Sequence, residues 1–259
     1  MNEKHRRSTP ASVEEIEGQL EGRNALTEAL RSGRTIDKVF IASGDTDRAL
    51  QRLAAQAKEA GAVVVPVDRR KLDAMSTTHA HQGVITLAAA HEYATIEDIL
   101  QEAESRGEPP LIVICDELTD PHNLGAIMRS AECAGAHGVI IPKRRSVGLT
   151  AVVAKASAGA VEYMKVARVV NINNAISELK DRGVWIFGTA AEGSIPMYKA
   201  DLAGPAAIVI GNEGQGMSPL VRKNCDVTVH IPMNGRISSL NASAAASILL
   251  YEAVRQRLG

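Results

Sequence analysis

The stretch that decides the fold of this chain lies near its end, as AAIVIGNEGQGMS at 206–218 and VTVHIPMNGRISSLNASAAASILLYE at 227–252. Two short apolar runs, Ile208–Ile210 and Val227–Ile231, are typical of buried strands, and each leads directly into a loop rich in glycine or asparagine. The second loop continues into a segment of Ala, Ser and Leu that predicts a long helix, Leu240–Leu258. Open α/β sheets bind ligands where their strands end in such loops, so a binding site is expected here.

The same alternation of apolar strand and helix fills the chain upstream of this stretch. The run LIVIC at 111–115 is continuously apolar, as in strands that are buried on both faces. Further strands are expected at Gly138–Ile141, Val161–Val169 and Val184–Thr189, and helices at Asn123–Gly135, Thr150–Gly159, Ile172–Arg182 and Pro219–Asn224. Six strands interleaved with helices predict an α/β fold with a mostly parallel sheet covered on both faces.

Changes in composition divide the chain into four parts. Residues 1–18 are polar and lack the apolar core of a secretory signal, so a disordered tail is expected. Residues 19–93 alternate helix and strand, which predicts a small α/β domain. Residues 94–108 are acidic, are expected to contain one or two helical turns, and precede Pro109-Pro110, which is typical of a linker. Residues 109–259 form the second domain.

Bulk properties exclude several classes of protein. The 259 residues carry a net charge of −1, and no apolar run is long enough to span a membrane. Three cysteines without CxxC spacing argue against disulfides or zinc and favour a reducing cytoplasm. His79 and His81 lack further ligands, so no metal is expected. The densest basic cluster of the second domain is Lys143-Arg144-Arg145, which by itself falls short of a nucleic-acid footprint.

A first polar loop follows the strand at 111–115 and reads DELTDPHNLG at 116–125. Pro121 fixes the turn and Asn123 can cap the helix that follows, so the loop can be purely structural. Arg129 lies six residues further on, among Ala, Ile, Met and Cys. An arginine on such a helix must be paired or must face a ligand.

The loop GNEGQG at 211–216 has the glycine order G-x-x-G-x-G, which differs from the dinucleotide fingerprint G-x-G-x-x-G and lacks the Lys-Ser/Thr of a phosphate-binding loop. Its glycines allow a ligand to approach the backbone closely, while Glu213 would repel phosphate. An uncharged or cationic ligand therefore fits better than a nucleoside triphosphate. Taken alone, the same glycines suit a simple tight turn.

The third loop, IPMNGRISSLN at 231–241, carries apolar residues that could line a slot for an adenine ring. Ser239 is placed to cap the last helix, and this structural role is the alternative to a functional one. Asn241 lies near the start of an otherwise apolar helix, and asparagine is a poor helix former. A role other than helix formation is therefore expected for Asn241.

Together, D-P-H-N-x-G-x-x-x-R (120–129), I-G-N-E-G-x-G-M (210–217) and I-P-M-x-G-x-x-x-S-L-N-x-S (231–243) resemble the three motifs of the SpoU (TrmH) family. Its members are RNA ribose 2′-O-methyltransferases of the SPOUT superfamily. The resemblance covers residues from about 109 to the end of the chain. EGRNALTEAL at 21–30 resembles the opening of the ribosomal-protein-like RNA-binding domain in the large-subunit rRNA members.

This resemblance implies a C-terminal trefoil knot, S-adenosylmethionine as methyl donor, no metal, and a homodimer with its site near the interface. The small-residue face Ala242, Ala245 and Ala246 would permit close packing there. The implied target is a guanosine of 23S rRNA, with neither DNA nor a membrane as partner. The implied cofactor-binding residues are Thr189, Gly211, Ile231, Met233 and Leu240. The implied catalytic and ribose-handling residues are Asn123, Arg129, Glu213, Ser239 and Asn241.

The chemistry constrains these roles. A guanidinium with a pKa above about 12 is a poor base, so Arg129 is expected to stabilise developing charge, and Glu213 to orient Arg129 or Asn123. Two other functions remain open, namely methylation of tRNA and RNA binding without catalysis. The glycine order argues against a nucleotide-dependent oxidoreductase.

Overall fold

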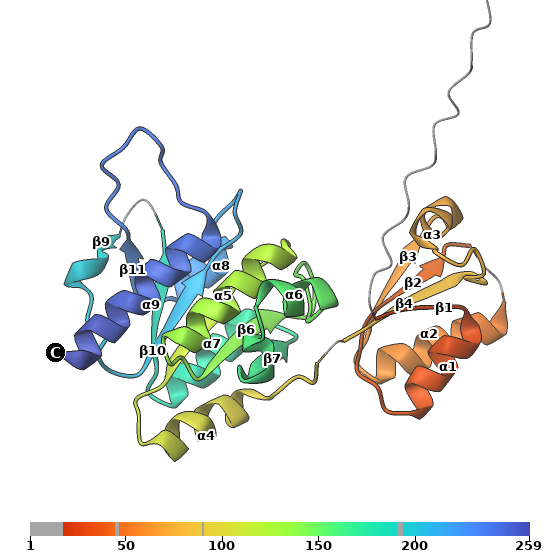
Figure 1. Ribbon diagram of the computed structural model, residues 1–259, viewed down its shortest axis with the longest axis horizontal. Helices are drawn as coiled ribbons and strands as arrows, with labels where there is room; N and C mark the ends of the chain where they lie inside the picture. The colour runs from red at the N-terminus through yellow and green to blue at the C-terminus, as the bar shows by residue number, and fades with distance from the viewer. Residues whose placement is uncertain (1–17, 45–46, 90, 191–193) are drawn as a thin grey trace, which may run out of the picture. The chain divides into compact units, whose positions relative to one another are not determined.

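The computed structural model describes residues 18–44, 47–89, 91–190 and 194–259 (Figure 1). The tail expected at 1–18 therefore lies outside the described residues except for Gly18. The chain divides into two compact units: unit 1 ends at Ala88 and unit 2 begins at Ala89. In the described part of the chain, no helix is both long and apolar enough to cross a bilayer.

Unit 1 is a small α/β layer structure, as expected. Its described strands form a mixed sheet in the order β1-β4-β2-β3, in which β2 and β3 are parallel and β4 is antiparallel to β1 and β2. Leu26 and Leu50, from α1 and α2, pack on one face of the sheet, and Leu72 of α3 packs on the other. The elements are β1 (Gln19–Glu21), α1 (Arg23–Arg31), β2 (Ile36–Ala42), α2 (Arg48–Glu59), β3 (Val63–Val67), α3 (Arg69–Met75) and β4 (Val84–Ala88).

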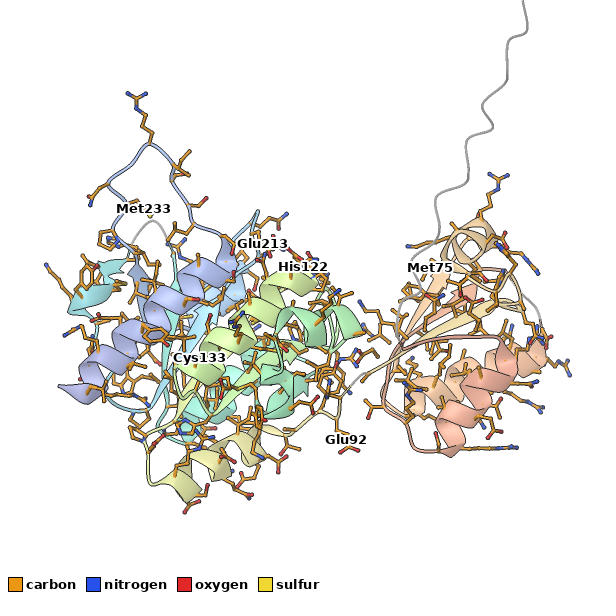
Figure 2. All side chains as sticks on the ribbon, in the orientation of Figure 1. Met75, Glu92, His122, Cys133, Glu213 and Met233 are labelled. Atoms are coloured by element: carbon orange, nitrogen blue, oxygen red, sulfur yellow. The ribbon has the colours of Figure 1, made fainter. Side chains whose placement is uncertain are left out.

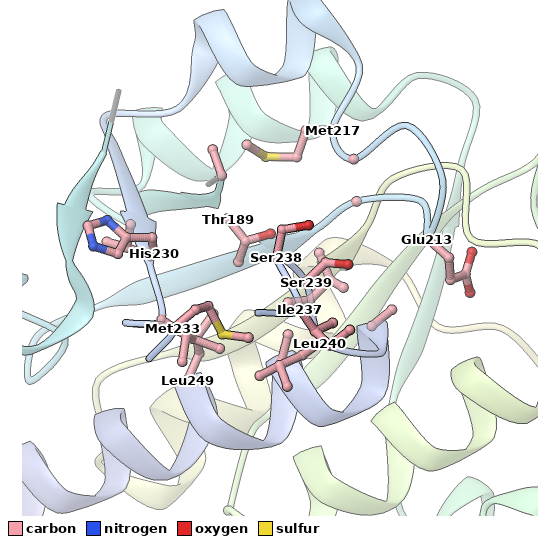
Figure 3. A pocket seen from close by; sticks show the side chains of 18 of the residues that line it. Thr189, Glu213, Met217, His230, Met233, Ile237, Ser238, Ser239, Leu240 and Leu249 are labelled. Carbon is pink, nitrogen blue, oxygen red and sulfur yellow. The ribbon is translucent and has the colours of Figure 1, made fainter. Parts of the chain in front are cut away.

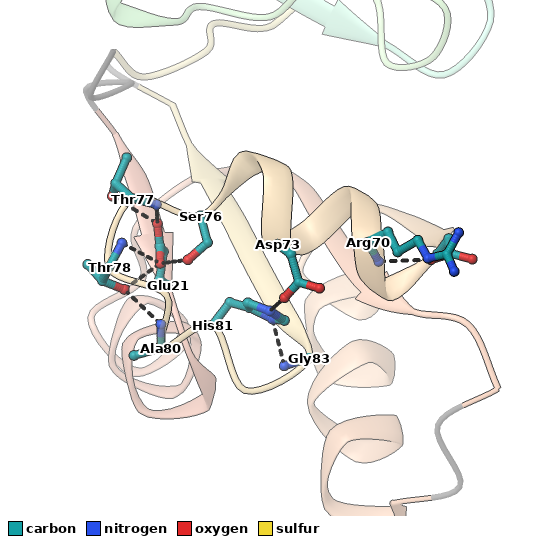
Figure 4. A network of polar contacts seen from close by, with 10 residues as sticks. Glu21, Arg70, Asp73, Ser76, Thr77, Thr78, Ala80, His81 and Gly83 are labelled. Carbon is teal, nitrogen blue, oxygen red and sulfur yellow. Dashed lines mark hydrogen bonds and ion pairs between the residues drawn. The ribbon is translucent and has the colours of Figure 1, made fainter. Parts of the chain in front are cut away.

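Glu21, at the end of β1, organises the loop between α3 and β4 (Figure 4). Its carboxylate accepts six hydrogen bonds, of 2.5–3.3 Å, from Gln19, Ser76, Thr77 and Thr78. Burial raises the pKa of this carboxyl, but the hydrogen bonds from Ser76, Thr78, Thr77 and Gln19 lower it more, and the net pKa lies far below the usual range. Glu21 therefore stays ionised and holds the loop.

Unit 2 is built on a parallel sheet. Its described strands form a seven-stranded sheet in the order β7-β6-β5-β10-β8-β11-β9, and every neighbouring pair is parallel. The strands are β5 (Leu111–Cys115), β6 (Gly138–Pro142), β7 (Val166–Val169), β8 (Trp185–Thr189), β9 (Ile195–Pro196), β10 (Ala206–Ile210) and β11 (Val227–His230). The helices are α4 (Ile96–Arg106), α5 (Pro121–Cys133), α6 (Ala151–Ala156), α7 (Ile172–Asp181), α8 (Pro219–Asn224) and α9 (Ala242–Leu258), with 3-10 turns η1 (Ala160–Glu162) and η2 (Met197–Lys199).

Helices cover both faces of this sheet, which confirms the predicted architecture. Leu111 and Val113 of β5 belong to one core with α5, α6 and α9, whereas the alternate residues Ile112 and Ile114 belong to a second core with α4, α7 and α8. The segment expected to be extended at Val161–Val169 is extended only in β7. The two-residue strand β9 was not expected. The trefoil knot stays a prediction.

The segment expected to link the domains is largely the helix α4 of unit 2. Thr95 and Asp98 form a reciprocal capping box at its start, and Gly107 ends it in the left-handed conformation with φ of 65°. Ile99 is fully buried against Gly138, where a Cβ would lie 2.5 Å from Ile99 atoms. The acidic residues that suggested a linker are on the solvent face of an amphipathic helix.

We predict that Glu21→Gln destabilises unit 1 by roughly 2 kcal/mol at neutral pH, because an amide NH₂ would face some of the loop's donors. Because the folded-state pKa of Glu21 is depressed, its stabilisation is complete above the unfolded pKa and is lost as the pH falls below about 4.5. The gap between variant and wild type should therefore shrink with acidification.

Hydrogen-exchange mass spectrometry of the peptide spanning 76–83 measures this effect. Glu28→Gln, which removes an exposed carboxylate of α1 paired with Arg31, is the matched control. Equal protection of the 76–83 peptide in Glu21→Gln and wild type at neutral pH would contradict the assignment.

Candidate functional site

Three loops meet at the carboxyl edge of the unit 2 sheet, and one hydrogen-bond chain joins them. Asn123 Nδ2, in the first turn of α5, donates to Glu213 Oε1 in the loop after β10, at 2.6 Å (Glu213 is labelled in Figure 2). Asn241 Nδ2, before α9, donates to Asn123 Oδ1 at 2.9 Å. The structure thus brings three residues of three different motifs into contact.

Helix capping sets the direction of this chain. Asn241 is the N-cap of α9, and its Oδ1 accepts hydrogen bonds from the backbone N–H groups of Ser243 and Ala244. With Oδ1 engaged, its Nδ2 must face Asn123, whose own Nδ2 is then left to face Glu213. The orientation of both amides follows from the cap.

Two capping predictions were wrong. Asp120, not Asn123, caps α5, through a 2.8 Å hydrogen bond from the backbone N–H of His122, with Pro121 as the first helical residue. Asn123 lies within the first turn, buried, where its side chain is free to bind the other loops. Asn241 caps α9 in place of Ser239, which is exposed and makes no hydrogen bond within the described part of the chain.

The glycine loop after β10 is both a tight turn and a bridge between loops. Asn212 and Gly216 exchange backbone hydrogen bonds of 2.8 and 3.0 Å, and Asn212 Nδ2 donates to the carbonyl of Glu117 at 3.0 Å. A Cβ on Gly211 would lie only 2.2 Å from the carbonyl carbon of Gly216. Glycine at 211 is therefore required for the loop to close on itself.

A cleft of about 1120 Å³ opens between the glycine loop and the loop before α9 (Figure 3). From Pro232 to Asn241 every residue of the second loop is exposed, and this loop forms an outer wall of the cleft. All five residues expected to bind the cofactor line it: Thr189, Gly211, Ile231, Met233 and Leu240. Of the residues expected to act in catalysis, Glu213 and Ser239 also line it.

The cleft has apolar walls that the sequence did not assign. Met217 and Leu249 lie on opposite sides of it, and Ile237 lies between them (Figure 3). Gly188 leaves room for Met217, since a Cβ there would come within 2.8 Å of its methyl carbon. Met217 is the last residue of the second motif, and its place there could have assigned it to the binding site. Nothing in the sequence could have assigned Leu249, because a leucine in an apolar helix usually belongs to the core.

Arg129 is exposed on α5, about 9 Å along the helix from Asn123. It makes no hydrogen bond or ion pair with any residue that the structure describes, and it does not line the cleft of its own chain. Among the described residues Arg129 therefore has no pairing partner, and the expectation that it faces a ligand stays open. Glu213, expected to orient Arg129 or Asn123, contacts Asn123.

The small-residue face of α9 is not free for a partner, contrary to expectation. Ala242 and Ala246 are buried in the core of unit 2, and Ala245 lines the cleft. On the same helix, the Ser247 hydroxyl contacts that of Ser130 on α5 at 2.7 Å. These small residues allow α5 and α9 to pack closely within one chain.

Cys115 and Cys225 of unit 2 are not suited to nucleophilic catalysis. Burial raises the pKa of the Cys115 thiol to about 12 and that of Cys225 to about 11, so neither forms the thiolate that nucleophilic catalysis needs. Within the described ranges, no group of three or more His, Cys, Asp or Glu could hold a metal ion.

We predict that Asn123→Asp destabilises unit 2 by roughly 2 kcal/mol at pH 7.5, because it sets a second carboxylate against Glu213. Repulsion raises the pKa of such a pair, so the loss should be complete at high pH and relieved as the pH falls towards 5, where one carboxyl binds a proton. Thermal unfolding, followed by the fluorescence of the single tryptophan, Trp185, measures this effect.

The matched control is Asn171→Asp at the N-cap of α7, where the side chain accepts the Asn173 N–H. An aspartate there caps equally well, so stability should be unchanged or slightly raised. Equal behaviour of the two variants would show that the contact between Asn123 and Glu213 does not matter.

Two family models match this chain, one on each unit. The model described as "SpoU rRNA Methylase family" matches residues 110–251. The model described as "RNA 2'-O ribose methyltransferase substrate binding" matches residues 19–94.

Similar proteins cover nearly the whole chain. YacO of Bacillus subtilis, whose name places it among TrmH family tRNA/rRNA methyltransferases, is 47% identical over 91% of this chain and 94% of its own. The 23S rRNA (guanosine-2'-O-)-methyltransferase RlmB of Ralstonia nicotianae is 44% identical over 92% of this chain and 95% of its own.

Solved structures agree with these matches. The SpoU methyltransferase AviRb of Streptomyces viridochromogenes, in complex with AdoMet, has a TM-score of 0.60 at 26% identity, covering 93% of this chain and 90% of its own. An AdoMet-bound rRNA methyltransferase of Sinorhizobium meliloti has a TM-score of 0.59 at 27% identity, covering 93% of this chain and 88% of its own. With its three motifs gathered at one edge of a parallel sheet and matched relatives along its length, this chain belongs to the SpoU rRNA methylase family.

Proposed function

We propose that this protein transfers a methyl group from S-adenosylmethionine to a ribose 2′-hydroxyl of RNA, and that its target is a guanosine of 23S rRNA. The observation that carries the proposal is the chain Glu213–Asn123–Asn241, which joins the three family motifs beside the cleft. The similarity to RlmB of Ralstonia nicotianae over nearly the full length supports the guanosine of 23S rRNA as target.

The cleft has the chemistry that S-adenosylmethionine requires. Its volume of about 1120 Å³ is ample for a ligand of this size, and Met217, Leu240 and Leu249 provide apolar surface for an adenine ring. The missing Cβ of Gly211 lets backbone groups approach the ligand. Glu213 places negative charge near the cleft, which suits a sulfonium. When bound, the cofactor supplies an electrophilic methyl group to the site.

The protein side chains then act on the ribose. We assign Arg129 to the phosphate and to the charge that develops on the 2′-oxygen, because its guanidinium is exposed and has no ion-pair partner among the residues that the structure describes. Glu213 and Asn241 hold Asn123 and so link the three motifs, which would fix the surface on which the ribose is positioned. Such positioning can lower a barrier by up to about 7–11 kcal/mol in ideal cases.

We propose in addition that the protein is a homodimer, as the resemblance of its motifs to the family implies. Arg129 lies outside the cleft of its own chain, and a second copy that approached α5 would meet it. Ser239, exposed in the cleft wall, is assigned to ribose handling on the same basis.

Methyl transfer from labelled S-adenosylmethionine tests the proposed function. We expect incorporation into unmodified 23S rRNA, and 2′-O-methylguanosine after nuclease digestion. Incorporation into tRNA alone would favour the tRNA alternative, for which the name of the Bacillus subtilis relative provides a reason. Incorporation into neither RNA would favour an RNA-binding protein without catalysis.

Two variants should separate catalysis from cofactor binding. Arg129→Ala is expected to reduce methyl transfer by at least 100-fold while S-adenosylmethionine binding, measured by calorimetry, stays nearly unchanged, because Arg129 does not line the cleft. Gly211→Ala is expected to weaken cofactor binding itself, because its Cβ must displace Gly216 and Met217. Equal loss of both properties in Arg129→Ala would overturn its catalytic assignment.

A further inference from the structure

A second functional element lies next to the site, in the loop that follows β6. We call residues 143–149 the basic loop, since it begins with Lys143-Arg144-Arg145. Arg144 and Arg145 are exposed and Lys143 is half-buried. Neither the Lys143 ammonium nor the Arg144 guanidinium has a hydrogen-bond or ion-pair partner among the residues that the structure describes.

The basic loop is tied to the first motif loop by three contacts. Arg145 pairs with Glu117 at 3.1 Å. The Ser146 hydroxyl and the Val147 N–H both donate to the carbonyl of Leu118, at 2.9 and 3.0 Å. The basic loop therefore has a fixed position relative to the β5 strand end.

Glu117 also links the basic loop to the glycine loop. The carbonyl of Glu117 accepts the hydrogen bond from Asn212 Nδ2, so Glu117 touches the basic loop through its side chain and the glycine loop through its backbone. On the other side, Arg168 of β7 approaches the carbonyl of Lys143 at 3.5 Å and lies over the ring of Tyr93 at 5.2 Å. Both ends of the Lys143–Arg145 turn are thus held, while Lys143 and Arg144 have no side-chain partner in the described part of the chain.

The sheet order sets how far these cations are from the cleft. β6 is next to β5, and β5 is next to β10, so the basic loop starts two strand spacings from the glycine loop, or about 10 Å across the sheet. A nucleic-acid strand that places one ribose at the cleft passes this distance within a few nucleotides. Cations on a fixed loop at that distance suit the regularly spaced phosphates of such a strand.

We propose that Lys143 and Arg144 bind phosphates of the RNA strand that flanks the target ribose, and so set which nucleotide reaches the cleft. This inference rests on the proposed function. Arg145 has a different role: its ion pair with Glu117 positions the loop. Phosphate contacts of this kind position a substrate without reading its bases, which agrees with a loop that has no aromatic residue for stacking.

The double variant Lys143→Ala/Arg144→Ala tests the proposal. For single-stranded RNA, each lost phosphate contact lowers the slope of log Kd against log salt concentration by about 0.7, so a decrease of about 1.4 is expected. KM for RNA should rise roughly tenfold, with kcat at saturating RNA and the affinity for S-adenosylmethionine nearly unchanged.

The control is Lys199→Ala/Lys223→Ala, which removes the same charge from exposed lysines of η2 and of the last turn of α8. It should leave the slope and KM at wild-type values. Thermal unfolding followed by Trp185 fluorescence shows whether all variants remain folded.

The outcomes separate the two claims. If wild type methylates RNA and the basic-loop variant keeps the wild-type slope and KM, the inference is wrong and the proposed function stands. If wild type binds RNA with the expected salt dependence but transfers no methyl group, the proposed function fails, and the change in slope still decides whether the basic loop contacts phosphate. If the slope of log Kd against log salt concentration falls equally in the basic-loop variant and in the control, the effect is one of general charge, and the inference is wrong.

Discussion

The site depends on the contact of Asn123 with Glu213 on one side and with Asn241 on the other. Each residue comes from a different motif, and a carboxamide can join the other two because it donates and accepts at once. Each hydrogen bond contributes only about 1 kcal/mol net, but removing the Asn123 side chain would break both of them at once. Asn123 is therefore the residue that keeps the three motifs together.

The parallel sheet makes that contact possible. In a parallel sheet all carboxyl ends face one edge, so loops that are far apart in sequence emerge near one another. Glycine at two positions allows the close approach: Gly188 accommodates Met217, and Gly211 packs on the backbone of Gly216. One wall of the cleft is therefore closely packed backbone, while the other, from Pro232 to Asn241, is exposed.

Both units use a carboxylate to organise a loop, with different results. Glu21 in unit 1 gathers hydroxyl and N–H donors from Ser76, Thr77 and Thr78, and all of its partners are local to that unit. Glu213 in unit 2 is bound to Asn123 through one oxygen and remains exposed. A carboxylate surrounded by donors stabilises a loop, whereas one that keeps an oxygen towards solvent is available to a substrate.

The sequence by itself determined the α/β class, the parallel sheet and the three loops at its edge. These features follow from local patterns: apolar runs such as Leu111–Cys115, and glycine or asparagine where each strand ends. Local patterns could not decide which of several polar residues caps a helix, so Asn123 and Ser239 were assigned wrongly. In the acidic segment 94–108 they contain the helical spacing of Ile96, Ile99 and Ala103, but they could not show that this stripe is buried against the sheet of unit 2.

Only the tertiary structure decided the partners of the motif residues. Asn123 meets Glu213 across 90 positions and Asn241 across 118, and no local propensity encodes contacts at such separations. It also showed that Arg129 has no partner among the described residues, and that Ala242 and Ala246 belong to the core of their own chain. The physical reason is that hydrogen bonds and burial depend on which surfaces meet after the sheet has formed, whereas periodicity depends only on neighbours along the chain.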